Sequence, residues 1–302
     1  MSIKAAFKSM RLRTLPLSLA GVILGILLAV ADYHVTLGTA LMIMLTTVCL
    51  QILSNLSNEL GDVLHGTDTP DRPGPNYGLN SGEMTVPQMK RLIGLFVGIT
   101  IFSGLGMIYV SYGTLFSFDA LGLMLLGAAA IAGAMKYTLG KNPYGYRGLG
   151  DIFVFIFFGL VSVLGAFFVA THTLPHPFML LPASAIGLFS VGVLNVNNIR
   201  DMRSDAANRV TVAIRLGPRR ARIYQTVLIV LGWVLLLTYC FLRFQDPWHY
   251  LFLLTLPLYV IHLRGVWKLD GHELDKMLPL LVMSTFLLSL LMGAGFTAFL
   301  IF

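Results

Sequence analysis

Nine apolar stretches, each about as long as a helix that crosses a lipid bilayer, constrain this chain more than any other feature of its sequence. A spanning helix needs about 20 mostly apolar residues. Charged residues make up only 12% of the 302, against about 25% in a soluble domain, so the chain has too few charges to cover a water-facing surface. We therefore expect one all-α integral membrane domain over residues 1–302, with spans at 14–31, 37–57, 92–112, 118–136, 152–170, 178–196, 223–242, 247–263 and 278–302.

The basic residues predict the orientation of these spans. If the helices alternate across the bilayer, every one of the 21 Lys and Arg residues except Arg243 falls on the side of the N-terminus. Cytoplasmic loops carry such an excess of Lys and Arg, so we expect the N-terminus in the cytoplasm and the C-terminus outside. The net charge of +7 then reports orientation, and no nucleic-acid partner is expected.

The N-terminus allows one alternative. Four basic residues precede an apolar run that ends Ala29-Val30-Ala31, a pattern similar to that of a cleaved signal peptide. The run is long, however, and Pro16 suits the first turn of a helix, which favours a retained first span.

A stripe of polar residues closes the second span. Asn58, Glu59 and Asp62 lie three, four and seven residues after Asn55, so these residues are expected to share one helix face, with Asp68 and Asp71 following shortly after. Carboxylates at a hydrocarbon boundary are costly, so these residues need a compensating partner.

A second polar cluster closes the sixth span. Asn198, Asp201 and Asp205 follow the same spacing, and Asn197-x-x-x-Asp201 repeats the Asn58-x-x-x-Asp62 pattern at the same predicted membrane face. Carboxylate and amide oxygens are the ligands that Mg²⁺ prefers. Two such clusters facing one cavity predict a site for Mg²⁺ and a diphosphate that bridges it.

Cations of the same face are candidate diphosphate ligands. Lys141 and Arg147 lie in the glycine-rich connection 136–151, and Arg200 and Arg209 lie beside the second cluster. Membrane-edge cations are explained almost equally well by orientation and lipid headgroups. The two cysteines, Cys49 and Cys240, show no spacing typical of a disulfide or zinc site.

Several motifs together resemble the UbiA superfamily of intramembrane aromatic prenyltransferases. They are RTLPLSLAG, QILSNLSNELGD with the downstream D-x-P-D-R, NPYGYRGLGDIFVFIFFG and LNVNNIRDMRSDAANRVTVAIRLG, and they look most like its MenA branch, which prenylates 1,4-dihydroxy-2-naphthoate. The resemblance implies a helical bundle around a central cavity with a lateral opening to lipid. It also implies a bacterial inner-membrane enzyme of menaquinone biosynthesis that takes polyprenyl diphosphate as its donor and releases CO₂.

The resemblance also implies roles for individual residues. Mg²⁺ and diphosphate would be held by a set of side chains from both motifs: Asn58, Glu59, Asp62, Asp68, Asn198, Asp201 and Asp205. Of these, the four aspartates are the candidate catalytic residues, and Tyr137, Lys141 or Arg147, with Arg200 and Arg209, would contact phosphate oxygens. Glu59 stands where the family usually has Asp, and Arg209 where it commonly has Lys.

Two alternatives stay open at this stage. The same apparatus could prenylate another acceptor, such as 4-hydroxybenzoate, haem or a chlorophyll precursor. The chain could instead be an ion-coupled transporter, for which acids near the bilayer centre would be expected.

Overall fold

The computed structural model describes residues 2–67, 77–206 and 209–298, and within them the chain is helical apart from its connections and one isolated bridge between Arg147 and Val210. The α-helices are α1 (Ile3–Met10), α2 (Leu15–Asp32), α3 (Leu37–Leu64), α4 (Val86–Tyr112), α5 (Phe118–Lys136), α6 (Gly150–Val154), α7 (Ala166–Thr171), α8 (Leu180–Arg200), α9 (Met202–Asp205), α10 (Val212–Leu242), α11 (Leu256–Lys268) and α12 (Met277–Thr297). A π-helix, η3 (Phe155–Gly165), joins α6 to α7, and short 3₁₀ turns are η1 (Leu12–Thr14), η2 (Tyr144–Tyr146), η4 (Pro177–Met179), η5 (Pro247–Thr255) and η6 (Gly271–Lys276).

The predicted all-α membrane fold is confirmed. The described residues contain nine helices or helix series that are long and apolar enough to cross a membrane, and each contains one of the predicted spans over its described length. The helices extend beyond the apolar runs because polar residues continue the same backbone hydrogen bonding: α3 runs on to Leu64, and α10 begins at Val212. Within α10, Gly217 has a φ of 75° immediately before Pro218, which breaks the helix into two parts.

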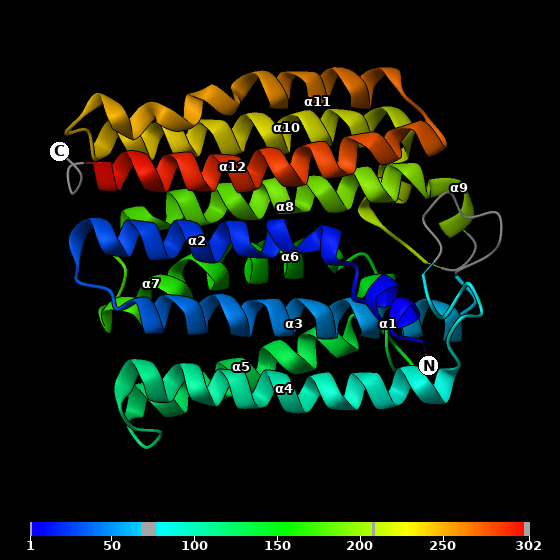
Figure 1. Ribbon diagram of the computed structural model, residues 1–302. Coiled ribbons are helices and arrows are strands. Elements are labelled where there is room, and N and C mark those ends of the chain that lie inside the picture. The colour runs from blue at the N-terminus through cyan, green and yellow to red at the C-terminus, as the bar shows by residue number, and fades with distance from the viewer. Residues whose placement is uncertain (1, 68–76, 207–208, 299–302) are drawn as a thin grey trace.

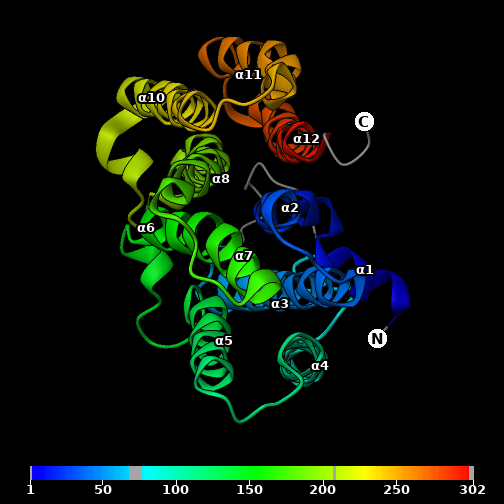
Figure 2. The same ribbon diagram turned by 90° about the vertical axis from the view of Figure 1, so that its left-hand side faces the viewer.

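The helices lie side by side along one direction, with the first and last described residues at opposite ends of the bundle (Figure 1). We call the end that holds the N-terminus, the C-terminal end of α3, α9 and η6 the polar end. Viewed along the helices, α2 lies inside the bundle, between α3 on one side and α8 and α12 on the other (Figure 2). Termini at opposite ends agree with an odd number of membrane crossings.

The best-packed core lies on the side of α8, α10, α11 and α12. Its largest fully buried side chains, Tyr239, Tyr259, Phe189 and Phe252, come from these helices and η5. Where η3 crosses α8, Gly159 and Gly187 allow the two backbones to touch, since a Cβ on Gly159 would lie 2.6 Å from the Gly187 Cα. Packing of this kind, through small residues, is typical of membrane helices. The opposite side of α2 is hollow, and the site lies there.

Candidate active site

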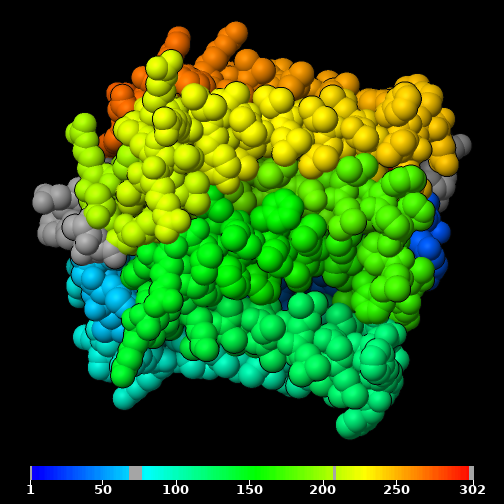
Figure 3. Space-filling model, turned by 180° about the vertical axis from the view of Figure 1, so that it is seen from behind, coloured from blue at the N-terminus to red at the C-terminus, as the bar shows by residue number. Residues whose placement is uncertain are grey.

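A cavity of about 500 Å³ lies between α2, α3, α5, the α6–η3–α7 series and α8. Its lining follows α3 from Ile43 to Asp62, which is about 28 Å along a helix that rises 1.5 Å per residue. Most of the lining is apolar and includes Phe153, Phe157 and Phe158, whereas polar side chains gather at the polar end. From behind, the surface is hollowed between the α5 segment and the α6–η3–α7 segment, and blue atoms of the N-terminal part are visible at its base (Figure 3).

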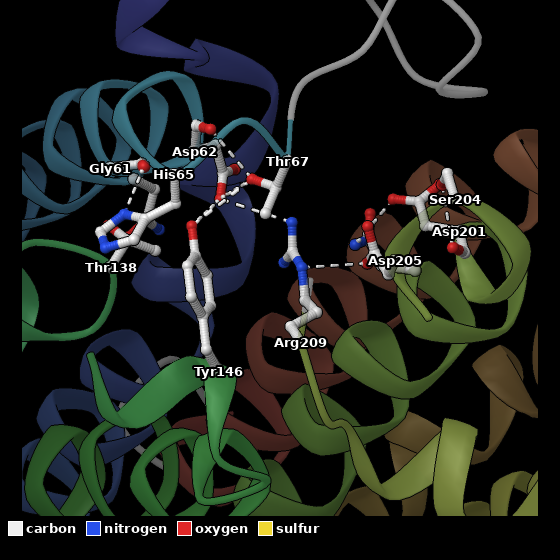
Figure 4. A network of polar contacts seen from close by, with 12 residues as sticks. Gly61, Asp62, His65, Thr67, Thr138, Tyr146, Asp201, Ser204, Asp205 and Arg209 are labelled. Carbon is white, nitrogen blue, oxygen red and sulfur yellow. Dashed lines mark hydrogen bonds and ion pairs between the residues drawn. The ribbon is translucent and has the colours of Figure 1, made fainter. Parts of the chain in front are cut away.

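Asp62 lies at the polar end of this cavity and is held by hydroxyl groups. Its Oδ1 accepts hydrogen bonds from the Tyr146 hydroxyl at 2.8 Å and from the Thr67 hydroxyl at 3.2 Å. Thr67 also donates to the Asp62 main-chain oxygen, and the edge of the His65 ring packs on Tyr146, 5.2 Å between centroids. These contacts bring the end of α3 and the turn η2 together, although 84 residues separate Asp62 from Tyr146 (Figure 4).

Arg209 connects the two acidic motifs. Its guanidinium lies 3.4 Å from Asp62 Oδ1 and 3.2 Å from Asp205 Oδ2, and its centre is 5.0 Å from the Tyr146 ring centroid (Figure 4). All three charged side chains are buried. The first and second motifs therefore do meet at one place, and a cation lies between their carboxylates.

The second motif has its own charge network. Arg200 donates to both carboxylate oxygens of Asp201, at 2.7 and 2.8 Å, and to the Asn197 amide oxygen at 2.8 Å. A third contact of Arg200 reaches Asp275 in η6. Asp201 and Asp205 are almost fully buried and do not line the cavity, whereas Asn197, Asn198 and Arg200 do.

The polar stripe of α3 divides into two parts. Asn58 and Asp62 line the cavity, and Asn58 is held by the Thr138 hydroxyl at 3.2 Å. Asn55 and Glu59, on the neighbouring row, do not line it. Consecutive helix residues differ by about 100° around the axis, so Glu59 is turned away from the position of Asn58.

The second row of α3, Asn55 and Glu59, forms hydrogen bonds to other segments of the chain. Asn55 donates to the main-chain oxygen of Met10 at 2.8 Å and to the Thr14 hydroxyl at 2.9 Å. Glu59 is fully buried and accepts a hydrogen bond from the Leu79 amide at 2.6 Å. The structure thus gives Glu59 a contact with the connection to α4 instead of bringing it to the cavity.

The remaining predicted residues are divided in the same way. Tyr137 lines the cavity, whereas Lys141 and Arg147 are exposed and do not line it. The exposure of Lys141 and Arg147 agrees with their interpretation as membrane-edge cations. Asp68, also predicted as a ligand, lies outside the described residues.

Two tyrosines at the polar end have raised pKa values. Burial raises the pKa of Tyr137 to about 12, although the nearby Arg209 opposes this effect. Burial, and then the charge of Asp62, also raise the pKa of Tyr146. Both phenols are therefore protonated at neutral pH. Tyr146 donates to the Asp62 carboxylate, and Tyr137 is a lining residue of the cavity.

Several residues of this arrangement were not singled out from the sequence. Tyr146, Thr67 and Thr138 orient the first motif through hydroxyl groups, and Asp275 reaches the second motif from 75 residues away. Asn197 was visible in the repeated Asn-x-x-x-Asp pattern, and it lines the cavity together with Asn198. No sequence signal distinguishes the hydroxyl residues from ordinary helix-end residues.

The fold and the cavity define a multi-pass membrane protein with a site for an amphiphile, apolar along its length and charged at one end. Residues 18–291 match the UbiA prenyltransferase family. The chain is 40% identical to the 1,4-dihydroxy-2-naphthoate octaprenyltransferase of Escherichia coli K12, over 97% of this chain and 94% of that protein. It is 35% identical to the enzyme of the same name from Haemophilus influenzae, over 97% and 96% of the two chains. The chain therefore belongs to the UbiA prenyltransferase family.

Solved structures agree on the fold. An apo UbiA homologue from Aeropyrum pernix superposes with a TM-score of 0.71 at 18% identity, covering 95% of this chain and 98% of that one. A UbiA homologue from Archaeoglobus fulgidus, bound to GPP and Mg²⁺, superposes with a TM-score of 0.66 at 15% identity, covering 97% and 98%. The membrane-embedded architecture is thus common to proteins whose sequences differ greatly.

Proposed function

We propose that this protein transfers a polyprenyl group from polyprenyl diphosphate to 1,4-dihydroxy-2-naphthoate, with loss of CO₂, and so makes the demethylmenaquinol precursor of menaquinone. Two relatives that are named 1,4-dihydroxy-2-naphthoate octaprenyltransferase match nearly the whole chain. The observation that carries the proposal is that residues of both polar clusters lie at the charged end of one cavity, where Arg209 lies between Asp62 and Asp205, and that the remaining length of the cavity is mostly apolar. Such a cavity fits a diphosphate attached to a long hydrocarbon.

The donor groups at the polar end suit Mg²⁺. Asn58, Asp62 and Asn198 present oxygen ligands at the cavity, and the carboxylate of Asp205 lies on the other side of Arg209. Within the described part of the chain, no three carboxylate, histidine or cysteine side chains are close enough to hold a metal by themselves. Mg²⁺ commonly takes one or two carboxylates and completes its shell with water and substrate phosphates, so this set fits a metal that arrives with a diphosphate. When bound, Mg²⁺ would neutralise negative charge on the departing diphosphate.

The protein's own residues then perform three tasks. Asn58, Asp62 and Asn198 hold the charged head at the polar end, while Tyr137 donates a hydrogen bond and Arg209 supplies positive charge there. The apolar wall receives the prenyl chain. Because this wall excludes water, an allylic cation formed inside it is protected from hydrolysis.

The reaction follows from this placement. The allylic C1–O bond breaks, and its electron pair leaves with the diphosphate. A carbon of the electron-rich naphthoate ring attacks C1. Over the whole reaction the carboxylate leaves as CO₂, its bonding electrons stay with the ring and the prenyl group takes its place, so the ring is aromatic again and no net proton is released. We propose that the polar end faces the cytoplasm of a bacterial inner membrane, where water-soluble naphthoate reaches it, and that the hollow between α5 and the α6–η3–α7 series admits the prenyl chain from the lipid.

Purified protein in liposomes tests this function. Given polyprenyl diphosphate, dihydroxynaphthoate and Mg²⁺, we expect the prenylated, decarboxylated naphthoquinol by mass spectrometry, and no product after chelation of the metal. If product forms from 4-hydroxybenzoate but not from the naphthoate, then 4-hydroxybenzoate is the acceptor and the proposed acceptor is wrong. Ion flux without prenyl transfer would instead support a transporter, although the acids of the described membrane helices lie within two turns of helix ends and not at mid-span.

A further inference from the structure

A second group of cations lies at the cavity, apart from the two acidic motifs. Arg11 and Arg13 both line it, together with Tyr77 and Asn80 from the connection before α4. The Arg11 guanidinium lies 3.8 Å from the Tyr77 ring centroid, and Arg13 donates to the Tyr77 hydroxyl at 2.9 Å. One tyrosine therefore positions two guanidinium groups at the polar end.

The charge of these arginines is less neutralised than that of the arginines at the acidic motifs. Within the described residues, no carboxylate lies within 4.0 Å of Arg11, and its buried Nε has no hydrogen-bond partner. Among the described residues, Arg13 lies 3.9 Å from the carboxylate of Asp275, and Asp275 makes a much closer contact with Arg200. A buried guanidinium nitrogen with no acceptor indicates that an acceptor from outside the chain completes the site.

The backbone at Arg11 supports a binding role. Arg11 ends α1 with a φ of 50° and a ψ of 51°, the left-handed conformation that glycine usually adopts at a helix end. Only one other non-glycine residue of the described chain, His172, has a positive φ. Unusual backbone conformations persist where the surrounding structure holds them, and they concentrate at functional sites. Here the turn lets the Arg11 side chain reach Tyr77.

We propose that Arg11 and Arg13, held by Tyr77, bind the carboxylate of the aromatic acceptor. Guanidinium forks match the planar geometry of a carboxylate and donate two hydrogen bonds to it. The proposal rests on the proposed function, in which the diphosphate occupies the acidic motifs and a second anion, the naphthoate, must lie nearby. The same forks could bind a phosphate of the donor, and the test distinguishes the two anions.

The test compares acceptors with and without the carboxylate. In Arg11→Gln and Arg13→Gln, we expect the KM for dihydroxynaphthoate to rise about tenfold to a hundredfold, as for loss of charge-assisted hydrogen bonds, with little change in the KM for polyprenyl diphosphate. With naphthalene-1,4-diol, which lacks the carboxylate, both variants should match the wild type. A rise in the KM for the diphosphate, or an equal loss with both acceptors, would overturn the proposal.

A binding measurement separates this proposal from the proposed function. By calorimetry, 1-hydroxy-2-naphthoate should bind the wild type more tightly than either variant, whereas 1-naphthol should bind all three alike. Arg13→Lys keeps the charge but not the forked guanidinium, so its affinity for 1-hydroxy-2-naphthoate should lie between those of the wild type and Arg13→Gln. The control Arg219→Gln removes an exposed arginine at the same end and should bind as tightly as the wild type. If no prenyl transfer is found, the proposed function fails, but this comparison still decides the carboxylate site: equal binding of 1-hydroxy-2-naphthoate by wild type and variants would refute it.

Discussion

Replacing Arg209 by methionine would leave two buried carboxylates without the cation between them. The exposed fractions of the side chains are 9% for Arg209, 7% for Asp62 and 1% for Asp205, so solvent screens these ion pairs little. Removing one partner of a buried ion pair costs about 3–5 kcal/mol. At about 2 °C per kcal/mol for a large chain, we expect the melting temperature of Arg209→Met, without metal, to fall by roughly 6–10 °C.

Mg²⁺ should reverse part of that loss. A cation that binds the folded state stabilises it by RT ln(1 + [L]/Kd), and the methionine variant removes the guanidinium that competes with a metal for these two carboxylates. The assay is a melting curve of purified protein in detergent, with EDTA or with increasing Mg²⁺, against Arg219→Met as a control that removes an exposed arginine. The reasoning is refuted if Arg209→Met and the wild type have the same melting temperature in EDTA, or if Mg²⁺ raises the melting temperatures of both proteins equally.

Five further substitutions each test a single side chain. Asp62→Ala should abolish prenyl transfer while the protein stays folded. Asp201→Ala should abolish transfer and also lower the melting temperature, because it leaves the buried guanidinium of Arg200 less well paired. Activity and melting temperature are measured on the same samples. Tyr146→Phe removes one hydrogen bond to a buried carboxylate, which is worth about 1.5–3 kcal/mol, so we expect the melting temperature to fall by roughly 3–6 °C and kcat/KM to fall about tenfold or more. Glu59→Ala should lower the free energy of unfolding by about 1–3 kcal/mol, because the buried Leu79 amide loses the Glu59 acceptor. The activity of this variant should depend on Mg²⁺ as that of the wild type does. Arg243→Ala, at the opposite end, should keep wild-type turnover in the transfer assay; a large loss there would contradict the assignment of the site to the polar end.

The spans could be predicted because bilayer thickness and helix rise together determine their length. The position of Asn58 and Asp62 on one face also followed from helix periodicity, and both line the cavity. Periodicity alone could not separate them from Glu59, because a polar face wider than one row contains residues that point to different neighbours. The structure separates the two rows, because Glu59 contacts the Leu79 amide whereas Asn58 and Asp62 line the cavity.

Contacts between distant segments could not be predicted. Arg209 and Asp62 are 147 residues apart, and Tyr146 reaches Asp62 from a third segment. Nothing local in the sequence says which of many membrane-edge arginines points inward. Lys141 and Arg147 are as close to recognisable motifs as Arg209 is, but they are exposed because their connection lies on the surface.

The two motifs are alike in sequence but differ in chemistry. Asp62 accepts hydrogen bonds from neutral hydroxyls and shares Arg209 with Asp205, whereas Asp201 holds Arg200 with both of its oxygens. Among the described contacts, a divalent cation that approaches the site competes with a longer ion pair at Asp62, 3.4 Å from Arg209, but with short charge-assisted hydrogen bonds of 2.7 and 2.8 Å at Asp201. Because the second displacement is the costlier one, the carboxylates of Asp62 and Asp205 should contribute more to metal affinity than that of Asp201, and the repeated pattern marks an asymmetric site.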